Sequence, residues 1–291
     1  MKTLTTIIAT AILAFGMQAC SQKSTNTYTS SGIFGGKTVK ASNKYVTKDI
    51  RVSNFTGLNV AGSPSVTYTQ KAGKPQVEVY TSDNIVDLLD IYVKDGTLHV
   101  GFKKGTSVSY NKLEVRVSSE TLNSIAVAGS GDIDILKGLK TERLHIKVAG
   151  SGDINMDNIS CAGKLDISIA GSGDISGNNI SCTELKTSIA GSGDMKLTKI
   201  ASTSADASIA GSGTVQLDGV TEDAQFHISG SGDLFASELQ AKNVSASVAG
   251  SGEIKCYATD FLKARTSGSG NIGYKGNPEL DYPKKGLYQI K

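Results

Sequence analysis

The chain has 291 residues, 38% of them hydrophobic and 20% charged, which is enough apolar material for a folded core. It contains 33 glycines and four prolines, but glycine does not recur at every third position, which excludes a collagen triple helix. The net charge of +3 is uneven: residues 129–254 carry nine basic and sixteen acidic side chains, so the bulk of the chain lacks the basic surface that nucleic-acid binding requires.

The first twenty residues have the pattern of an export signal. Lys2 precedes an apolar run over residues 7–15, which is too short to span a bilayer, because a transmembrane helix needs about twenty residues. A small residue precedes Cys20, as in bacterial lipoprotein signals, although Met17 stands where such signals usually carry leucine. By this resemblance residues 1–19 are a signal peptide and Cys20 is the lipid-bearing N-terminus; the alternative is a soluble secreted protein.

The segment that follows, residues 20–45, is rich in Ser, Thr, Gly, Asn and Lys. Because so few apolar side chains cannot offset the entropy of ordering, it is expected to be a flexible tether. We expect the chain to be exported and lipid-anchored to the outer membrane, facing either the periplasm or the cell surface.

Residues 46–120 predict an irregular N-terminal β region. Three segments alternate polar and apolar residues, as strands with one buried face do: 76–80, 97–102 and 112–117. Asp95-Gly96 predicts a hairpin turn, and the residues around Gly62 resemble a degenerate copy of the repeat described next.

The strongest feature of the chain is a Gly-Ser-Gly motif that occurs eight times. Successive copies start 18 to 21 residues apart, at Gly129, Gly150, Gly171, Gly191, Gly211, Gly230, Gly250 and Gly268. A period near twenty residues indicates a fold of stacked repeats. Apolar and polar residues alternate on both sides of each copy, and no segment sustains the period of an amphipathic helix, so helical repeats are disfavoured.

Each repeat therefore predicts a strand, a glycine corner, a second strand and a turn. Stacking such units about 4.8 Å apart pairs their backbones and buries their apolar faces, which gives a parallel β-helix over residues 121–291. Equivalent residues then form columns, for example Ile154, Ile175 and Met195. The tail from Tyr274 to Lys291 is expected to cap the end of the stack.

Serial Ala-Gly-Ser-Gly-Asp-Ile copies in an exported chain resemble the putative autotransporter-adhesin head GIN domain family, known mostly from Bacteroidetes. The likeness covers Phe55 to the C-terminus. It implies an all-β fold, namely a single-stranded parallel β-helix (solenoid), right-handed and similar in shape to the pectate-lyase superfamily, with a role in adhesion. It supplies no catalytic residues.

Aspartate follows the corner in four successive repeats, at Asp132, Asp153, Asp174 and Asp194. Like charges about 4.8 Å apart would cost about 0.9 kcal/mol per pair even in water. The carboxylates are expected to accept backbone hydrogen bonds in the corner, and the alternative is that they bind calcium through oxygen ligands. We favour the hydrogen bonds, since Thr214 and Asn271 interrupt the column, and we expect no metal site and no cofactor.

Parallel β-helices include polysaccharide lyases and hydrolases, whose chemistry needs carboxylates or basic side chains converging on one cleft. The carboxylates here recur mostly once per repeat, and His99, His145 and His227 lie far apart at positions expected to be solvated. No Gly-x-Ser-x-Gly nucleophile motif occurs. We therefore expect no enzyme and no catalytic residue.

Cys161 and Cys182 each lie eleven residues after their repeat glycine and should occupy adjacent coils. The expected Cα separation suits a disulfide, whereas parallel side-chain directions oppose its dihedral angle, so a disulfide and a reduced pair are both open. A zinc site is not expected, because paired Cys-x-x-Cys spacing is absent from the sequence.

Together these features predict a non-enzymatic cell-envelope lipoprotein, a β-helical rod on a tether. Rows of outward side chains such as Ser168, Ser188 and Ser208 would bind a macromolecular surface ligand, either a glycan or a protein, and no nucleic acid. The alternatives are a carbohydrate-active β-helix enzyme and a purely structural element of the envelope.

Overall fold

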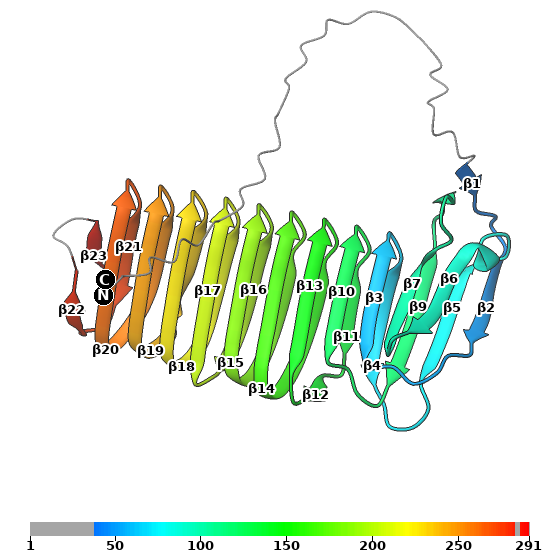
Figure 1. The fold of residues 1–291 in the computed structure, drawn as a ribbon, viewed down its shortest axis with the longest axis horizontal. Helices are drawn as coiled ribbons and strands as arrows, with labels where there is room; N and C mark the ends of the chain where they lie inside the picture. The colour runs from blue at the N-terminus through cyan, green and yellow to red at the C-terminus, as the bar shows by residue number, and fades with distance from the viewer. Residues whose placement is uncertain (1–37, 283–285, 291) are drawn as a thin grey trace, which may run out of the picture. The chain divides into compact units, whose positions relative to one another are not determined.

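The repeats fold into stacked coils (Figure 1). The computed structural model describes residues 38–282 and 286–290. Strands of each coil pair in parallel with those of the next, so that Gly150 lies beside Gly171 and Gly171 beside Gly191. Among the described residues the single helical element is the short 3-10 turn η1 (Val86–Leu88). The prediction of an all-β, single-stranded parallel solenoid is confirmed.

The strands of the rod beyond its first coil are β10 (Ser124–Gly129), β11 (Ile133–Leu136), β12 (Leu139–Thr141), β13 (Leu144–Gly150), β14 (Ile154–Gly171), β15 (Ile175–Gly191), β16 (Asp194–Ala201), β17 (Ser204–Gly211), β18 (Thr214–Gly230), β19 (Asp233–Gly250), β20 (Glu253–Gly268) and β21 (Asn271–Lys275). Several of these strands continue around a corner of the coil, which is why they are long.

Each coil has three inward-facing segments, whereas the sequence predicted two. In β15 the buried positions alternate within 175–177, 180–182 and 185–189, and a step of three residues separates these segments. Asn179 lies in the first step with φ +57°, in the left-handed region that Asn tolerates better than most residues. The corner was missed because one Asn in a polar stretch gives no periodic signal.

The Gly-Ser-Gly corner is closed by the coil before it. The carbonyl oxygen of Gly150 accepts the N–H groups of Ser172 and Gly173 at 2.9 and 3.1 Å. Gly171 has φ +139°, and a Cβ atom placed on it would lie 2.2 Å from that same carbonyl oxygen. Glycine is therefore required both for the backbone angle and for the close approach of the two coils.

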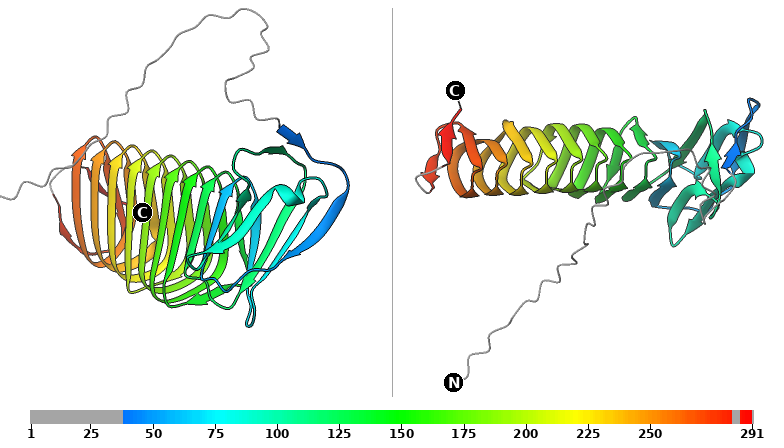
Figure 2. Two further views of the ribbon diagram at one scale, coloured as in Figure 1. Left: turned by 45° about the vertical axis from the view of Figure 1, so that its right-hand side comes forward. Right: turned by 90° about the horizontal axis from the view of Figure 1, so that it is seen from above.

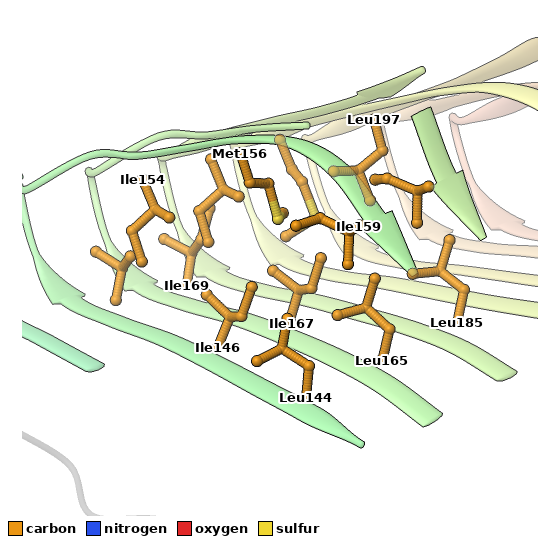
Figure 3. Packing of buried hydrophobic residues seen from close by; sticks show 14 of the residues in the cluster. Leu144, Ile146, Ile154, Met156, Ile159, Leu165, Ile167, Ile169, Leu185 and Leu197 are labelled. Carbon is orange, nitrogen blue, oxygen red and sulfur yellow. The ribbon is translucent and has the colours of Figure 1, made fainter. Parts of the chain in front are cut away.

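The interior of the rod is filled by columns of apolar side chains (Figure 3). Ile154, Ile175 and Met195 are register partners and are at most 1% exposed, which confirms the predicted column. A second column contains Leu165 and Leu185. Each such side chain stabilises the fold by about 1.5–3 kcal/mol relative to an exposed position, so the columns hold the coils together.

The first coil of the rod comes from residues well before the repeats. Strands β3 (Gly57–Gly62) and β4 (Ser65–Gln70) pair in parallel with β10 and β11, and Gly62 lies beside Gly129. The prediction that the sequence around Gly62 is a degenerate corner is confirmed. The chain then leaves the rod and returns to it at β10.

The excursion forms a cap at the N-terminal end of the rod. Its elements are β5 (Gln76–Ser82), β6 (Leu89–Lys94), β7 (Thr97–Phe102), β8 (Ser107–Ser109) and β9 (Leu113–Ser119), with β1 (Thr38–Lys40) and β2 (Tyr45–Ile50) from the preceding chain. β7 and β9 extend the rod in parallel, whereas β5, β6 and β2 pair antiparallel to their neighbours. The predicted hairpin turn at Asp95-Gly96 is confirmed, with φ of +51° and +72°.

The other end of the rod is completed by short strands of the tail. β22 (Glu279–Asp281) pairs with β20, and β23 (Leu287–Gln289) pairs with β21 (Figure 2). The Tyr288 hydroxyl donates to Glu253 Oε1 at 2.5 Å, and its ring lies against Gly273. The tail thus adds a partial coil over the last repeat.

Candidate functional site

One side of the rod carries two rows of outward side chains, mostly serine and alanine, which we call the serine–alanine face. One row consists of Lys147, Ser168, Ser188, Ser208, His227 and Ser247, and the other of Ala149, Ala170, Ala190, Ala210, Ser229 and Ala249. Members of each row are direct register partners, so the predicted alignment of Ser168, Ser188 and Ser208 is confirmed. The result is a flat surface whose chemistry repeats at the spacing of the strands.

Ser168, Ser188, Ser208 and Ser247 of this face are half-buried, and two of them donate hydrogen bonds to the rod. Ser168 Oγ donates to the Ile146 carbonyl and Ser208 Oγ to the Thr187 carbonyl, both at 3.4 Å. These are long hydrogen bonds, so the hydroxyls keep capacity to bind a polar group presented from solvent.

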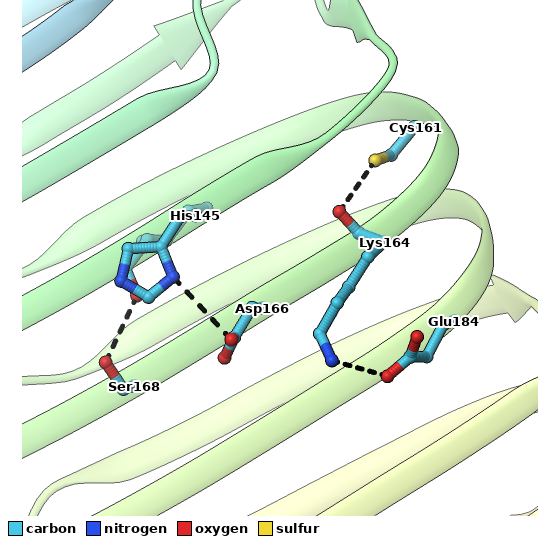
Figure 4. A network of polar contacts seen from close by, with 7 residues as sticks. His145, Cys161, Lys164, Asp166, Ser168 and Glu184 are labelled. Atoms are coloured by element: carbon cyan, nitrogen blue, oxygen red, sulfur yellow. Dashed lines mark hydrogen bonds and ion pairs between the residues drawn. The ribbon is translucent and has the colours of Figure 1, made fainter.

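A row of charged side chains borders the face (Figure 4). His145, Asp166, Lys186 and Asp206 are successive register partners. His145 Nδ1 lies 3.7 Å from Asp166 Oδ2. Because acidic members alternate with basic or titratable ones, the row carries little net charge, and the face it borders is close to neutral.

The aspartates that follow the corners accept backbone hydrogen bonds. Asp153 Oδ1 accepts the N–H of Asp174 at 2.9 Å, and Asp174 Oδ1 accepts the N–H of Asp194 at 2.9 Å. Asp132, Asp194 and Asp233 bind the next coil in the same way. The favoured explanation of this column is confirmed: each carboxylate holds the corner of the following coil, which offsets the repulsion between neighbours.

Within residues 38–282 and 286–290 no group of three or more His, Cys, Asp and Glu side chains is arranged to hold a metal ion.

The three histidines occupy separate places. His99 stacks on Tyr92 with ring centroids 5.0 Å apart, and His227 Nδ1 lies 2.8 Å from Ser247 Oγ. His145 lies in the charged row that borders the serine–alanine face, where it is the register partner of Asp166.

Cys161 and Cys182 are direct register partners in adjacent coils, as predicted, and both are free thiols. Cys161 Sγ donates to the Lys164 carbonyl at 3.1 Å and to the Glu142 carbonyl at 3.3 Å (Figure 4). Of the two alternatives left open by the sequence, the structure contains the reduced pair. Burial raises the pKa of Cys161, and burial together with Cys161 raises the pKa of Cys182 to about 12.

A cleft in the cap was not foreseen from the sequence. A cavity of about 310 Å³ is lined by Ile50, Leu89 and Ile91, with Lys48 and Lys103 at its edge. The isoleucines are only partly buried against the core. The antiparallel pairing of β2 with β5, which places Lys48 and Ile50 at this cleft, is non-local, and nothing in the sequence indicated it.

The predicted lipidation residue, Cys20, lies outside the described residues. No helix in the described part of the chain is long and apolar enough to cross a membrane.

Comparisons with known proteins agree with this architecture. A crystal structure of a putative lipid binding protein from Parabacteroides distasonis matches with a TM-score of 0.67 and 26% identity, over 88% of this chain and 100% of the other. A putative adhesin from Parabacteroides merdae matches with a TM-score of 0.69 and 25% identity, over 87% and 99%.

A second putative adhesin from Parabacteroides distasonis shares the fold, with a TM-score of 0.69 and 24% identity over 87% and 100% of the two chains. No protein of curated function matches the chain. The family model for the "putative auto-transporter adhesin, head GIN domain" matches residues 54–178 and 162–278, and the chain therefore belongs to that family.

Proposed function

We propose that this protein is a non-enzymatic, lipid-anchored adhesin of the cell envelope that binds a macromolecule along the serine–alanine face. The observation that carries the proposal is the continuous register of these two rows over successive coils, in which ten of the twelve side chains are serine or alanine. Membership of an adhesin family supports it. A long, flat, nearly neutral surface binds through its area, and side chains that lose little conformational entropy reduce the cost of ordering on contact.

Anchoring at Cys20 is part of this proposal. The signal-like sequence and the polar segment that follows support it. Strand β1, which begins at Thr38, pairs with β8 in the cap, so a tether leading to Thr38 joins the rod at its cap end.

The test is binding to a glycan array and to surface proteins, with a polysaccharide-degradation screen in parallel. Ser188→Arg places a bulky charge in the middle of the face and should abolish saturable binding. Ser181→Arg, an exposed serine on another side of the same coil, is the matched control and should bind as the natural chain does. Equal loss in both variants, or turnover of a polysaccharide, would contradict the proposal.

The cap cleft supports a second candidate, the binding of an anionic lipid. A relative with 26% identity is described as a putative lipid binding protein. Residues 38–119 carry eleven basic and seven acidic side chains, whereas residues 120–282 carry thirteen basic and twenty acidic ones, so the basic excess lies at the cleft end. Displacement of a fluorescent fatty acid should be lost in Ile91→Asp and unaffected by Ser188→Arg; the reverse result rejects this candidate.

A further inference from the structure

The two partnered thiols form a site that adhesion does not use. Cys161 in β14 and Cys182 in β15 are buried, with 2% and 7% of their surface exposed, and they are register partners in adjacent coils. We propose that this pair binds one Cu(I) ion, a soft monovalent cation, as a linear bis-thiolate. The inference is independent of the proposed function.

The spacing of the coils favours a bridging ion over a disulfide. In-register residues of parallel strands are about 4.8 Å apart, and side chains leaving both strands in the same direction keep that separation. A disulfide requires Cβ atoms about 3.5–4.5 Å apart and sulfurs about 2.05 Å apart, so the two side chains would have to converge. A thiolate–metal bond is about 2.3 Å long in zinc sites, and two bonds of that order in line span about 4.6 Å, which is close to the coil spacing.

The ligand set selects the class of ion. Thiolates prefer soft cations such as Cu(I), whereas zinc takes four ligands and calcium six to eight oxygens. Thr141 is the register partner of Cys161 in the preceding coil, so the next position of this column holds a threonine hydroxyl. An ion that two thiolates are enough to coordinate therefore fits the pair.

A small ion can approach these coils from outside the rod. A shallow depression of about 360 Å³ is lined by both cysteines together with Ser160, Ser181 and Thr183. On binding, each S–H bond breaks and its proton passes to solvent, two S–Cu bonds form, and copper stays Cu(I), so no electron is transferred. Because both thiols have raised pKa values, binding releases two protons and should weaken by up to about 100-fold for each pH unit of acidification.

The column itself suggests variants that leave the fold intact. Thr141 Oγ1 donates to the Arg143 carbonyl at 3.1 Å, much as the Cys161 thiol donates to the Lys164 carbonyl. A hydroxyl is thus accommodated in the adjacent coil, and Cys161→Ser and Cys182→Ser should fold. Cys256, a third buried free thiol, is not part of the pair, so Cys256→Ser is the matched control.

The experiment is an anaerobic titration of the full exported chain, prepared without reductant, with Cu(I) buffered by bicinchoninate. The natural chain and Cys256→Ser should each retain one Cu(I) per chain in competition with the chelator. Cys161→Ser and Cys182→Ser should each bind at least 100-fold more weakly. Cu(I) should raise the melting temperature of the natural chain and of Cys256→Ser, and leave that of the two paired-thiol variants unchanged. Equal binding by the paired-thiol variants, no retention by the natural chain, or a Cys161–Cys182 disulfide found by mass spectrometry would overturn the proposal.

Discussion

Replacing a corner glycine tests the stacking geometry on which the rod depends. In Gly171→Ala the new Cβ would lie 2.2 Å from the Gly150 carbonyl oxygen, which is backbone and cannot rotate away. The residue would also be held at φ +139°, a region that L-residues avoid at a cost of about 1–3 kcal/mol. Displacing the carbonyl weakens the bonds from Ser172 and Gly173, at about 0.5–1.5 kcal/mol each. The total loss is about 2–6 kcal/mol.

The matched control is Gly73→Ala in the loop before β5. Gly73 also has a positive φ, +102°, but nothing lies within 4 Å of a Cβ placed on it. This variant should lose only the stability that the unfavourable backbone angle costs, about 1–2 kcal/mol. Thermal unfolding followed by circular dichroism measures both, and Gly171→Ala should lower the melting temperature by roughly 10 °C. If the two variants have the same melting temperature, the close contact between coils is not the reason that the corner requires glycine.

Three further predictions concern the columns and the tail. Ile167→Ala, at a position with 0% exposure, should lower the denaturant midpoint by an amount equivalent to about 2–5 kcal/mol, and a change below 1 kcal/mol would contradict its place in the core. Asp174→Ala should cost about 1 kcal/mol because the N–H of Asp194 loses its acceptor, whereas Asp174→Asn keeps an acceptor and should be nearly neutral; equal losses would show that charge matters instead. Burial and the Glu253 carboxylate raise the pKa of Tyr288 from 10 to about 12, so the stabilisation it gives is complete below pH 10 and is lost as the pH rises through 12. Ultraviolet titration should show one tyrosinate forming near pH 12 that is missing in Tyr288→Phe, and an unchanged titration curve would refute the contact.

The sequence determined the rod because its information is periodic. In a stack of coils the neighbours of a residue lie one period away, so the recurrence of Gly-Ser-Gly and of the alternating apolar residues identifies both the corners and the columns. The aspartate column followed from chemistry: like charges at the strand spacing need a partner, and the N–H of the next coil supplies it. Asp95-Gly96 was readable because a two-residue turn is local.

Tertiary structure decided what periodicity does not encode. The coil has a corner at Asn179, where one residue takes a positive φ without any special sequence pattern. The first coil precedes an excursion of some fifty residues, and the pairing of β2 with β5 and of β6 with β7 creates the cap cleft from segments that no repeat relates. Whether Cys161 and Cys182 form a disulfide or stay reduced depended likewise on the direction in which the two strands orient their side chains. The spacing of the two cysteines along the chain does not determine that direction.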